Sequence, residues 1–368
     1  MADIEIGRGR LAQAGYHLAD IGIVPSRRTR DVDDVTMAWE IDAFRFEMPM
    51  VAHPSDATMS PASVVEIGRL GGLGVLNAEG LWTRYDDPQP VYERLSRAEG
   101  NATTLLQAAY AEPIKRELIT RCIEQIRSAG VTTAVRLSPQ HTLTYADAVL
   151  AAGVDLLVIQ GTVVSAEHVS VASEPLNLKT FIADLDVPVI VGGCTNYQTA
   201  LHLMRTGAAG IIVGVGADRQ SSTEEVLGIR VPMATAIADA ASARRDYLDE
   251  TGGRYVHVIA DGELADSGSV AKALACGADA VMLGDALSHG QECPAAGLWW
   301  ESVAAHPSLP RGRLGRGRPH TEPLAKILLG PDDRADGTEN VFGAVRRALA
   351  KCGYSDVKAF QKVELVYR

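Results

Sequence analysis

The residues best suited to chemistry gather in one short stretch, positions 217–225. It carries three hydroxyls and three carboxylates: Ser221, Ser222, Thr223, Asp218, Glu224 and Glu225. The stretch follows an apolar run at 211–213, which predicts a buried strand, and two glycines, Gly214 and Gly216, which let the backbone turn sharply. A helix is expected to begin near Pro232. A strand, a glycine turn, a polar loop and a helix in this order predict a site at the carboxyl end of a parallel strand.

Short apolar segments alternate with amphipathic ones through the middle of the chain. Eight strands are expected, at 49–52, 74–76, 132–137, 155–159, 188–191, 211–213, 256–260 and 280–283. Helices are expected between them, at 63–71, 113–129, 144–152, 176–184, 197–206, 232–250 and 268–276. Short Val, Ile and Leu runs bounded by glycine are typical of strands covered on both faces. Eight such units predict an α/β fold, a (β/α)8 TIM barrel; a doubly wound sheet is the alternative.

The expected organisation has three parts: an N-terminal arm and hairpin at 1–47, the barrel at 48–287, and a flap and tail at 288–368 packed on the barrel. The hairpin strands are predicted at 35–39 and 43–46, and the tail is predicted to hold a helix at 340–352. A basic run, RGRLGRGR, ends the proline-rich part of the tail. It fits either a solvated loop or a moving lid that contacts an anion.

Composition narrows the class of protein. The chain has 368 residues with 46% hydrophobic and 22% charged residues, enough to bury a sizeable core. Its net charge of −11 argues against a nucleic-acid partner, and no run approaches the ~18–20 apolar residues of a membrane helix. The five cysteines are scattered without a CxxC pair, and the first twenty residues carry several charges. These features predict a cytoplasmic protein with reduced thiols, no disulfides and no metal site.

Four segments together resemble the IMP dehydrogenase/GMP reductase family in its short form without the regulatory CBS pair. They are EIGRLGGLGVLN at 66–77, VPVIVGGCTNYQTALHLMRTGAAGIIVGVG at 187–216, VPMATAIADA at 231–240 and VIADGELADSGSVAKALACGADAVMLGDAL at 258–287. Residues 80–90 and 336–354 are similar to an actinobacterial branch of that family. The resemblance implies a barrel that binds a purine nucleotide at its mouth, uses NAD(P), and forms homo-oligomers, tetramers or octamers.

The resemblance also assigns a nucleophile. In the family, a cysteine in the loop after the sixth strand attacks C2 of the purine, and a hydride passes to or from the nicotinamide. In this chain the cysteine position holds Ser221, whereas the family's threonine is kept as Thr223. A serine hydroxyl needs a strong base held against it, whereas a thiolate is accessible near neutral pH. We therefore expect Ser221 to be a polar contact or loop residue, with a nucleophilic role as the alternative.

The family's phosphate site is altered as well. The family holds the nucleotide phosphate on backbone N–H groups of two glycine-containing loops, which correspond here to Gly262 and Gly284. Glu263 and Asp285 follow these glycines directly, and Asp218 lies on the neighbouring loop. Each carboxylate opposes a bound dianion by several kcal/mol. We expect the site to be closed to phosphate, leaving it to a cation, an amine or nothing; the alternative is that these acids point into solvent.

Positive charges near this expected site are few. Arg219 is the one basic residue expected to offset the acids. The family also uses an arginine of the flap as a base, and four residues are candidates for it: Arg311, Arg313, Arg316 and Arg318. The sequence does not choose among them.

The ends of the other strands supply the remaining candidates. The family's S-P-M-D segment corresponds to residues 53–56, so Asp56 is kept and His53 is either a base or a histidine of the rim. The family counterpart of Asp261 holds the ribose hydroxyls. The family's aspartate before S-S-Q-G is not evident here, since its place is occupied by Ile159, Gln160, Gly161 and Thr162. The expected catalytic set is Ser221, Thr223 and Asp56. The expected ligand-binding set is Asp218, Asp261, Gly262, Glu263, Gly284, Asp285, Gly214 and Gly216.

Three functions fit these residues. The first is an inactive paralogue that binds a ligand or a partner. The second is a repurposed enzyme acting on an unphosphorylated or cationic purine-like substrate with acid–base residues. The third is ordinary NAD(P)-dependent oxidation or reduction of a purine nucleotide, which the missing thiol disfavours. The repurposed enzyme would be favoured if the acids converge on a pocket and their pKa values are raised. The inactive paralogue would be favoured if a loop at 216–230 fills the mouth.

Overall fold

The computed structural model describes residues 3–99, 102–169, 175–295, 297–302, 312–317 and 321–368. Eight parallel strands pair in sequence order, and the last pairs with the first, which closes the barrel. They are β6 (Met50–Ala52), β7 (Leu73–Asn77), β8 (Ala134–Leu137), β9 (Leu156–Gln160), β10 (Val189–Cys194), β11 (Gly210–Val213), β12 (His257–Ala260) and β13 (Ala280–Leu283). The (β/α)8 prediction is confirmed, and closure excludes the doubly wound sheet.

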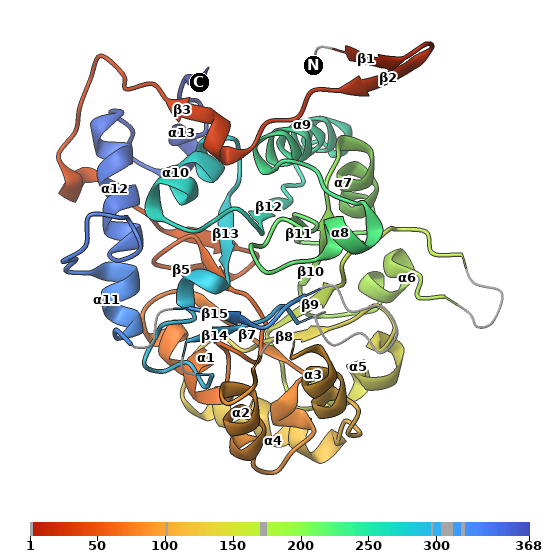
Figure 1. The fold of residues 1–368 in the computed structure, drawn as a ribbon. Helices are drawn as coiled ribbons and strands as arrows, with labels where there is room; N and C mark the ends of the chain where they lie inside the picture. The colour runs from red at the N-terminus through yellow and green to blue at the C-terminus, as the bar shows by residue number, and fades with distance from the viewer. Residues whose placement is uncertain (1–2, 100–101, 170–174, 296, 303–311, 318–320) are drawn as a thin grey trace.

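Helices surround the strands (Figure 1). The seven helices predicted between strands correspond to α1 (Pro61–Arg69), α4 (Arg116–Ser128), α5 (Thr142–Ala151), α6 (Leu178–Ala183), α7 (Tyr197–Met204), α9 (Met233–Thr251) and α10 (Ser267–Ala275). Their ends lie within a few residues of the predicted ones. Helix α1 begins earlier than predicted because the Ser60 hydroxyl caps it by accepting from the Ser63 N–H, with Pro61 in the first turn. The predicted tail helix is α12 (Val341–Lys351), which packs on α10 and on α11 (Leu324–Leu329).

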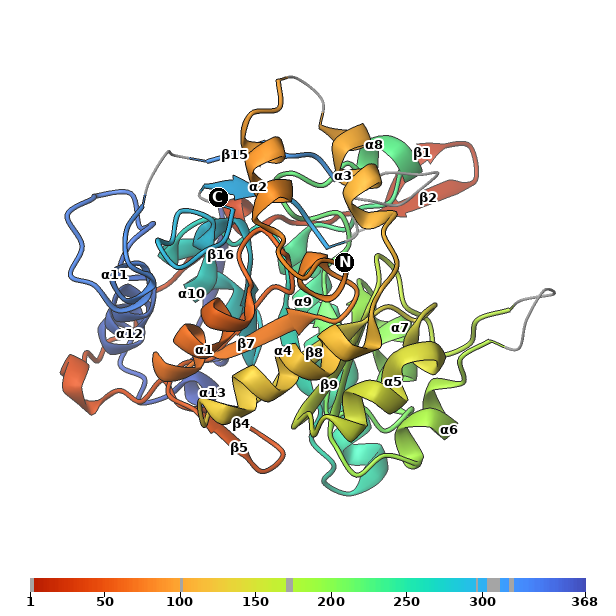
Figure 2. The same cartoon turned by 90° about the horizontal axis from the view of Figure 1, so that it is seen from below.

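A hairpin closes the amino-terminal end of the barrel. It consists of β4 (Trp39–Ile41) and β5 (Phe44–Phe46), with Asp42 at a positive φ of 52° in the turn. The predicted first strand, 35–39, was therefore placed too early. Trp39, Ile41 and Phe46 are buried in one cluster with inward-facing residues of the strands, such as Ile212. Figure 2 shows this hairpin at one end of the barrel, while α8 (Thr223–Leu227) and β15 (Gly315–Arg316) lie at the opposite end.

The N-terminal arm contains a hairpin that the sequence analysis did not predict. Strands β1 (Asp3–Gly7) and β2 (Arg10–Gln13) pair with each other and project from the body (Figure 1). Further along the arm, β3 (Ile21–Ile23) pairs with β16 (Leu365–Tyr367), so this part of the arm lies beside the C-terminal strand. No helix of the described residues is both long and apolar enough to cross a bilayer.

The mouth of the barrel is covered by segments from two parts of the chain. Helices α2 (Gln89–Ser96) and α3 (Thr103–Tyr110) come from the excursion after β7, and the two-residue strands β14 (Leu298–Trp299) and β15 come from the tail (Figure 2). Trp299 and Trp300 are fully buried there. The predicted polar loop at 217–225 is partly helical, because α8 begins at Thr223 and ends where Gly228 takes a left-handed φ of 67°.

Candidate active site

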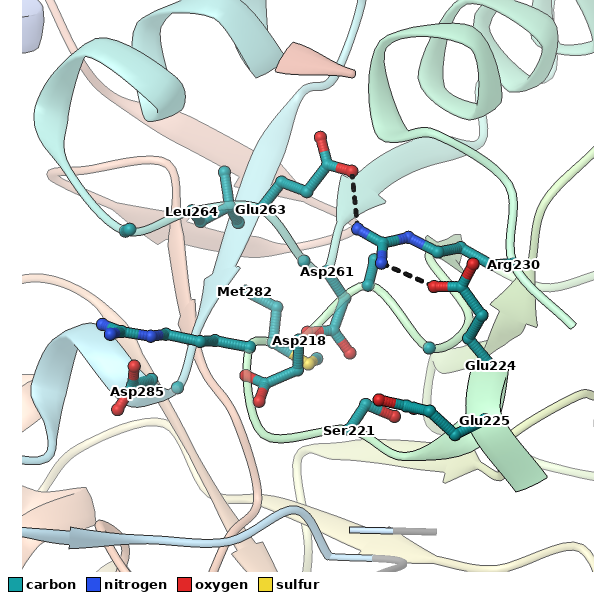
Figure 3. A pocket seen from close by; sticks show the side chains of 16 residues that line it. Asp218, Ser221, Glu224, Glu225, Arg230, Asp261, Glu263, Leu264, Met282 and Asp285 are labelled. Atoms are coloured by element: carbon teal, nitrogen blue, oxygen red, sulfur yellow. Dashed lines mark hydrogen bonds and ion pairs between the residues drawn. The ribbon is translucent and has the colours of Figure 1, made fainter. Parts of the chain in front are cut away.

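The acids after β11, β12 and β13 line one cavity of about 360 Å³ at the carboxyl ends of these strands (Figure 3). Asp218 comes from the loop after β11, Asp261 directly follows β12, and Asp285 follows β13. The cavity is also lined by Ser221 and Arg230. Neighbouring parallel strands end at the same edge, so residues far apart in sequence meet there.

Asp218 and Asp261 lie side by side at the centre of this cavity (Figure 3). The Asp218 carboxylate accepts hydrogen bonds from the Trp299 Nε1–H at 3.0 Å and the Gln220 N–H at 2.8 Å. Burial raises the pKa of Asp218 to about 6. Burial, and next the charge of Asp218, raise the pKa of Asp261 to about 8, although the Gln160 Nε2–H donates to it at 3.0 Å. Near pH 7 the first is mainly ionised and the second mainly protonated.

The outer acids of the cavity are paired with arginines. Arg230 bridges Glu224 at 2.7 Å and Glu263 at 3.6 Å, and Arg313 forms an ion pair with Glu225. The pKa of Asp285 is raised by burial, against the opposing charge of Arg219. The expectation that Arg219 alone offsets the acids was therefore wrong, since Arg230 also lines the cavity.

Glu263 turns away from the centre of the cavity toward Arg230 and the N-terminal arm (Figure 3). Its carboxylate contacts His17 Nδ1 at 2.6 Å and accepts from the Leu18 N–H at 2.9 Å. The residue holds a left-handed φ of 57°, which a non-glycine residue rarely adopts. Glu263 thus ties the arm to the loop after β12. It does not point into solvent, and it does not face the centre as a free charge.

The glycines of the expected phosphate site pack against other parts of the chain. A Cβ added to Gly284 would overlap the indole ring of Trp299, and one added to Gly262 would overlap Ala217. A Cβ added to Gly214 would overlap the Asp261 carbonyl oxygen. These glycines allow loops and a tryptophan ring to approach closely. Trp299 was not assigned a role from the sequence, although the WW pair in the tail was visible.

Ser221 lies under the flap segment 312–317. It forms a bridge with Gly312, and the Arg313 N–H donates to the Gln220 carbonyl at 3.0 Å. The Ser221 Oγ–H donates to Thr223 Oγ1 at 3.1 Å. Ser221 lines the larger cavity, whereas Thr223 lines a smaller one, together with Gly214 and Gly216. A threonine hydroxyl is not a base able to activate serine.

Two further candidate residues, His53 and Asp56, do not line the larger cavity. His53 lines the smaller cavity, with its Nε2 3.9 Å from Asp261 Oδ2, and burial together with the charge of Arg136 lowers its pKa to about 3. It is therefore neutral near pH 7. Asp56 lines neither cavity. It is buried and accepts from the Leu81 N–H at 2.9 Å and the Tyr110 hydroxyl at 2.6 Å, so the structure does not bring it to Ser221 and Thr223.

The flap arginines separate into two groups. Arg313 pairs with Glu225, and Arg316 donates to backbone carbonyls at the end of α2, including that of Ser96 at 3.0 Å. Both therefore hold the flap across the mouth. The other two candidates, Arg311 and Arg318, lie outside the described residues. Among the described part of the chain, no cluster of three or more His, Cys, Asp or Glu is arranged to hold a metal ion.

Comparison with known proteins identifies the family. A family model for the IMP dehydrogenase / GMP reductase domain matches residues 15–306. The chain belongs to the IMP dehydrogenase/GMP reductase family. It is 27% identical to the inosine-5′-monophosphate dehydrogenase of Aquifex aeolicus over 332 residues, covering 84% of this chain and 64% of that protein.

More similar relatives match this family member along its length. An uncharacterized oxidoreductase of Mycobacterium leprae is 56% identical over 371 residues, covering 99% of each chain. The crystal structure of an IMP dehydrogenase/GMP reductase-like protein from Corynebacterium glutamicum superposes with a TM-score of 0.95. It is 52% identical, with 100% of this chain and 98% of that one covered.

The buried acids predict how stability depends on pH. The pKa of Asp261, about 8 in the fold, lies above its ordinary value of 3.8. Between these values Asp261 holds a proton in the folded chain that it has lost in the unfolded chain, so the contribution of Asp261 to wild-type stability falls as pH rises. We expect the free energy of unfolding of Asp261→Asn minus that of wild type to grow between pH 5 and 8, by up to about 1.4 kcal/mol per pH unit. Urea unfolding measures it; a constant difference would contradict the assignment.

Proposed function

We propose that this family member binds an unphosphorylated, positively charged, purine-like ligand at the barrel mouth and carries out neither the IMP dehydrogenase nor the GMP reductase reaction. One observation carries the proposal. Asp218, Asp261 and Asp285 share a cavity in which Gly284 is packed against Trp299. The site offers carboxyl groups where the family offers glycine amides to a phosphate.

The two carboxyl groups at the centre of the cavity, those of Asp218 and Asp261, favour a cation over a phosphate. Arg230 already neutralises Glu224 and Glu263 in part, and Arg219 lies close enough to affect Asp285. Within the described residues, neither Asp218 nor Asp261 forms an ion pair with a lysine or arginine, and His53, whose Nε2 lies 3.9 Å from Asp261 Oδ2, is neutral. A dianion beside them meets repulsion of several kcal/mol at an effective dielectric of ~20, whereas an ammonium or amidinium group meets attraction.

Ser221 is poorly suited to act as a nucleophile. We propose that Ser221 stands at the position of the family's nucleophilic cysteine, in a short family member without CBS domains. The Ser221 hydroxyl donates to the Thr223 hydroxyl, which cannot take its proton at neutral pH. A covalent intermediate through sulfur cannot form there. The five free cysteines do not compensate, because none of them lines either cavity.

A second candidate function is proton transfer on that same ligand. Asp218 and Asp261 have pKa values of about 6 and 8, so one carboxylate and one carboxylic acid face the cavity near neutral pH. Such a pair can act as a base and an acid. This favours a repurposed enzyme over a paralogue that only binds, and the loop 216–230 lines the cavity without filling it.

NAD(P) is the cofactor that family membership suggests. The smaller cavity, whose lining includes Gln160, has a volume of about 40 Å³ and is too small for a nicotinamide ring. The free cysteines and the lack of a spanning helix among the described residues support our proposal of a cytoplasmic location.

The binding proposal is tested with a matched pair of ligands. IMP carries a phosphate at the 5′ position, whereas 5′-amino-5′-deoxyinosine carries an ammonium there. We expect the amine to bind at least tenfold more tightly than IMP by titration calorimetry, and Asp218→Asn or Asp285→Asn to weaken it about tenfold. The exposed Asp147→Asn serves as the control. Micromolar affinity for IMP would overturn the proposal.

The reaction proposal is tested by absorbance at 340 nm. With IMP and NAD, or GMP and NADPH, we expect no turnover by the wild-type chain. Ser221→Cys restores the sulfur but leaves Asp218 and Asp285 in place, so we expect at most a trace of activity. An active family member assayed in parallel serves as the control. Turnover by the wild type near the control's rate would exclude this proposal.

We also propose that the chain forms a homo-oligomer, a tetramer or octamer. The hairpin β1–β2 exposes Ile4, Ile6 and Leu11 to 50%, 65% and 61%, and an isolated hairpin is marginally stable. Burial between subunits would stabilise it. Light scattering should give a tetramer or octamer for the full chain and a smaller species after Ile6→Ser with Leu11→Ser, but not after Leu143→Ser on α5. A monomeric full chain would refute the proposal.

A further inference from the structure

The smaller cavity at the mouth is lined by buried polar atoms without protein partners. Within the described residues, His53 Nδ1, Gln160 Oε1 and Thr162 Oγ1 have no hydrogen-bond partner. All three residues line this cavity. A buried polar atom left without a partner costs roughly 1–3 kcal/mol, so such atoms are rare in native folds. Three around one small cavity indicate a place where a ligand supplies the missing hydrogen bonds.

The size of this cavity restricts what enters it. Its volume of about 40 Å³ exceeds the ~10–15 Å³ that one water needs, but it cannot hold a whole bicyclic base. Gly216 and Asp261 line both cavities, so the small one adjoins the larger cavity of about 360 Å³. One edge of a ring can therefore occupy the small cavity while the rest of the ligand lies in the large one.

The polar lining is mixed, because it includes the carboxyl groups of Asp261 and Glu301 as well as His53, Gln160 and Thr162. His53 is neutral because burial and Arg136 lower its pKa to about 3, so it does not attract an anion. The buried Arg136 lies behind it, with its guanidinium donating to the Gln160 carbonyl at 3.1 Å and pairing with Glu79 at 3.7 Å. Gln160 Oε1 can only accept, whereas the Thr162 hydroxyl can donate or accept.

We propose that the small cavity is a subsite for the lactam or amide edge of the ligand, with a ring N–H donating to Gln160 Oε1. The adjacent carbonyl oxygen then accepts from the Thr162 hydroxyl or from His53. The Gln160 Nε2–H is already committed to Asp261 at 3.0 Å, which fixes the amide with its oxygen free. The inference rests on the proposed function for the placement of the cationic part, and it makes Gln160 a specificity-determining residue.

Three cationic nucleosides that differ only at this edge test the subsite. 5′-Amino-5′-deoxyinosine carries the lactam N–H, its 1-methyl derivative replaces that hydrogen with a methyl group, and 5′-amino-5′-deoxynebularine lacks the lactam. By calorimetry we expect 5′-amino-5′-deoxyinosine to bind the wild type at least about tenfold more tightly than the other two nucleosides. In Gln160→Leu the three Kd values should fall within threefold of one another. We expect Thr162→Val to raise the Kd of 5′-amino-5′-deoxyinosine only a few-fold.

The outcomes separate the two proposals. Equal Kd values for the three nucleosides on the wild type would overturn the subsite while leaving the cationic site standing. Binding of none of them, with IMP bound instead, would overturn the proposed function and the subsite with it. Because Gln160→Leu can disturb Asp261, its thermal unfolding midpoint and its Kd for the nebularine derivative serve as controls. A loss of discrimination with an unchanged nebularine Kd supports the subsite.

Discussion

The packing of the Trp299 indole on the backbone of Gly284 is the contact on which the barrel mouth depends. Only a glycine lets the ring approach this closely, and the same ring donates to Asp218 and lies edge-on to His53 at 5.4 Å. The ring shields Asp218 from water, and its burial raises the pKa of that carboxyl. It also occupies the approach to the Gly284 backbone. One side chain from the tail thereby changes both the shape and the charge preference of the site.

The fold was predictable because its signals are local. Eight buried apolar runs, each followed by an amphipathic stretch, require a closed parallel sheet whose two faces are covered. The features that were missed depend on contacts made elsewhere. The β1–β2 hairpin has no strong turn signal beyond its glycines, and α8 forms where a polar stretch is held under the flap by the Ser221–Gly312 bridge. The same local reasoning placed the first strand of the β4–β5 hairpin too early, because Asp42 supplies the turn.

The candidate site was predictable only in part, for the same reason. Strand order places Asp218, Asp261 and Asp285 at the ends of adjacent strands, so their convergence follows from the fold. The hydrogen-bonding partners of the acids do not follow from the fold. His17 reaches Glu263 across 246 positions of sequence, and Tyr110 reaches Asp56 across 54. The first contact turns an acid away from the centre, and the second encloses a predicted catalytic residue in hydrogen bonds. Resemblance to the family could indicate positions but not these orientations.

The proton balance of the cavity explains how the fold tolerates its acids. Two buried carboxylates side by side without a cation would repel each other strongly, so the pair retains a proton and Asp261 holds it near neutral pH. That proton does what a bound cation would do, since either one removes the repulsion. A positively charged ligand therefore replaces a proton already present, and the acids need no rearrangement to receive it. A phosphate would instead require both carboxyls to be protonated, and Asp218, with a pKa of about 6, is mainly ionised at neutral pH. The charge state that makes the empty fold stable is thus the one that selects against the nucleotide phosphate.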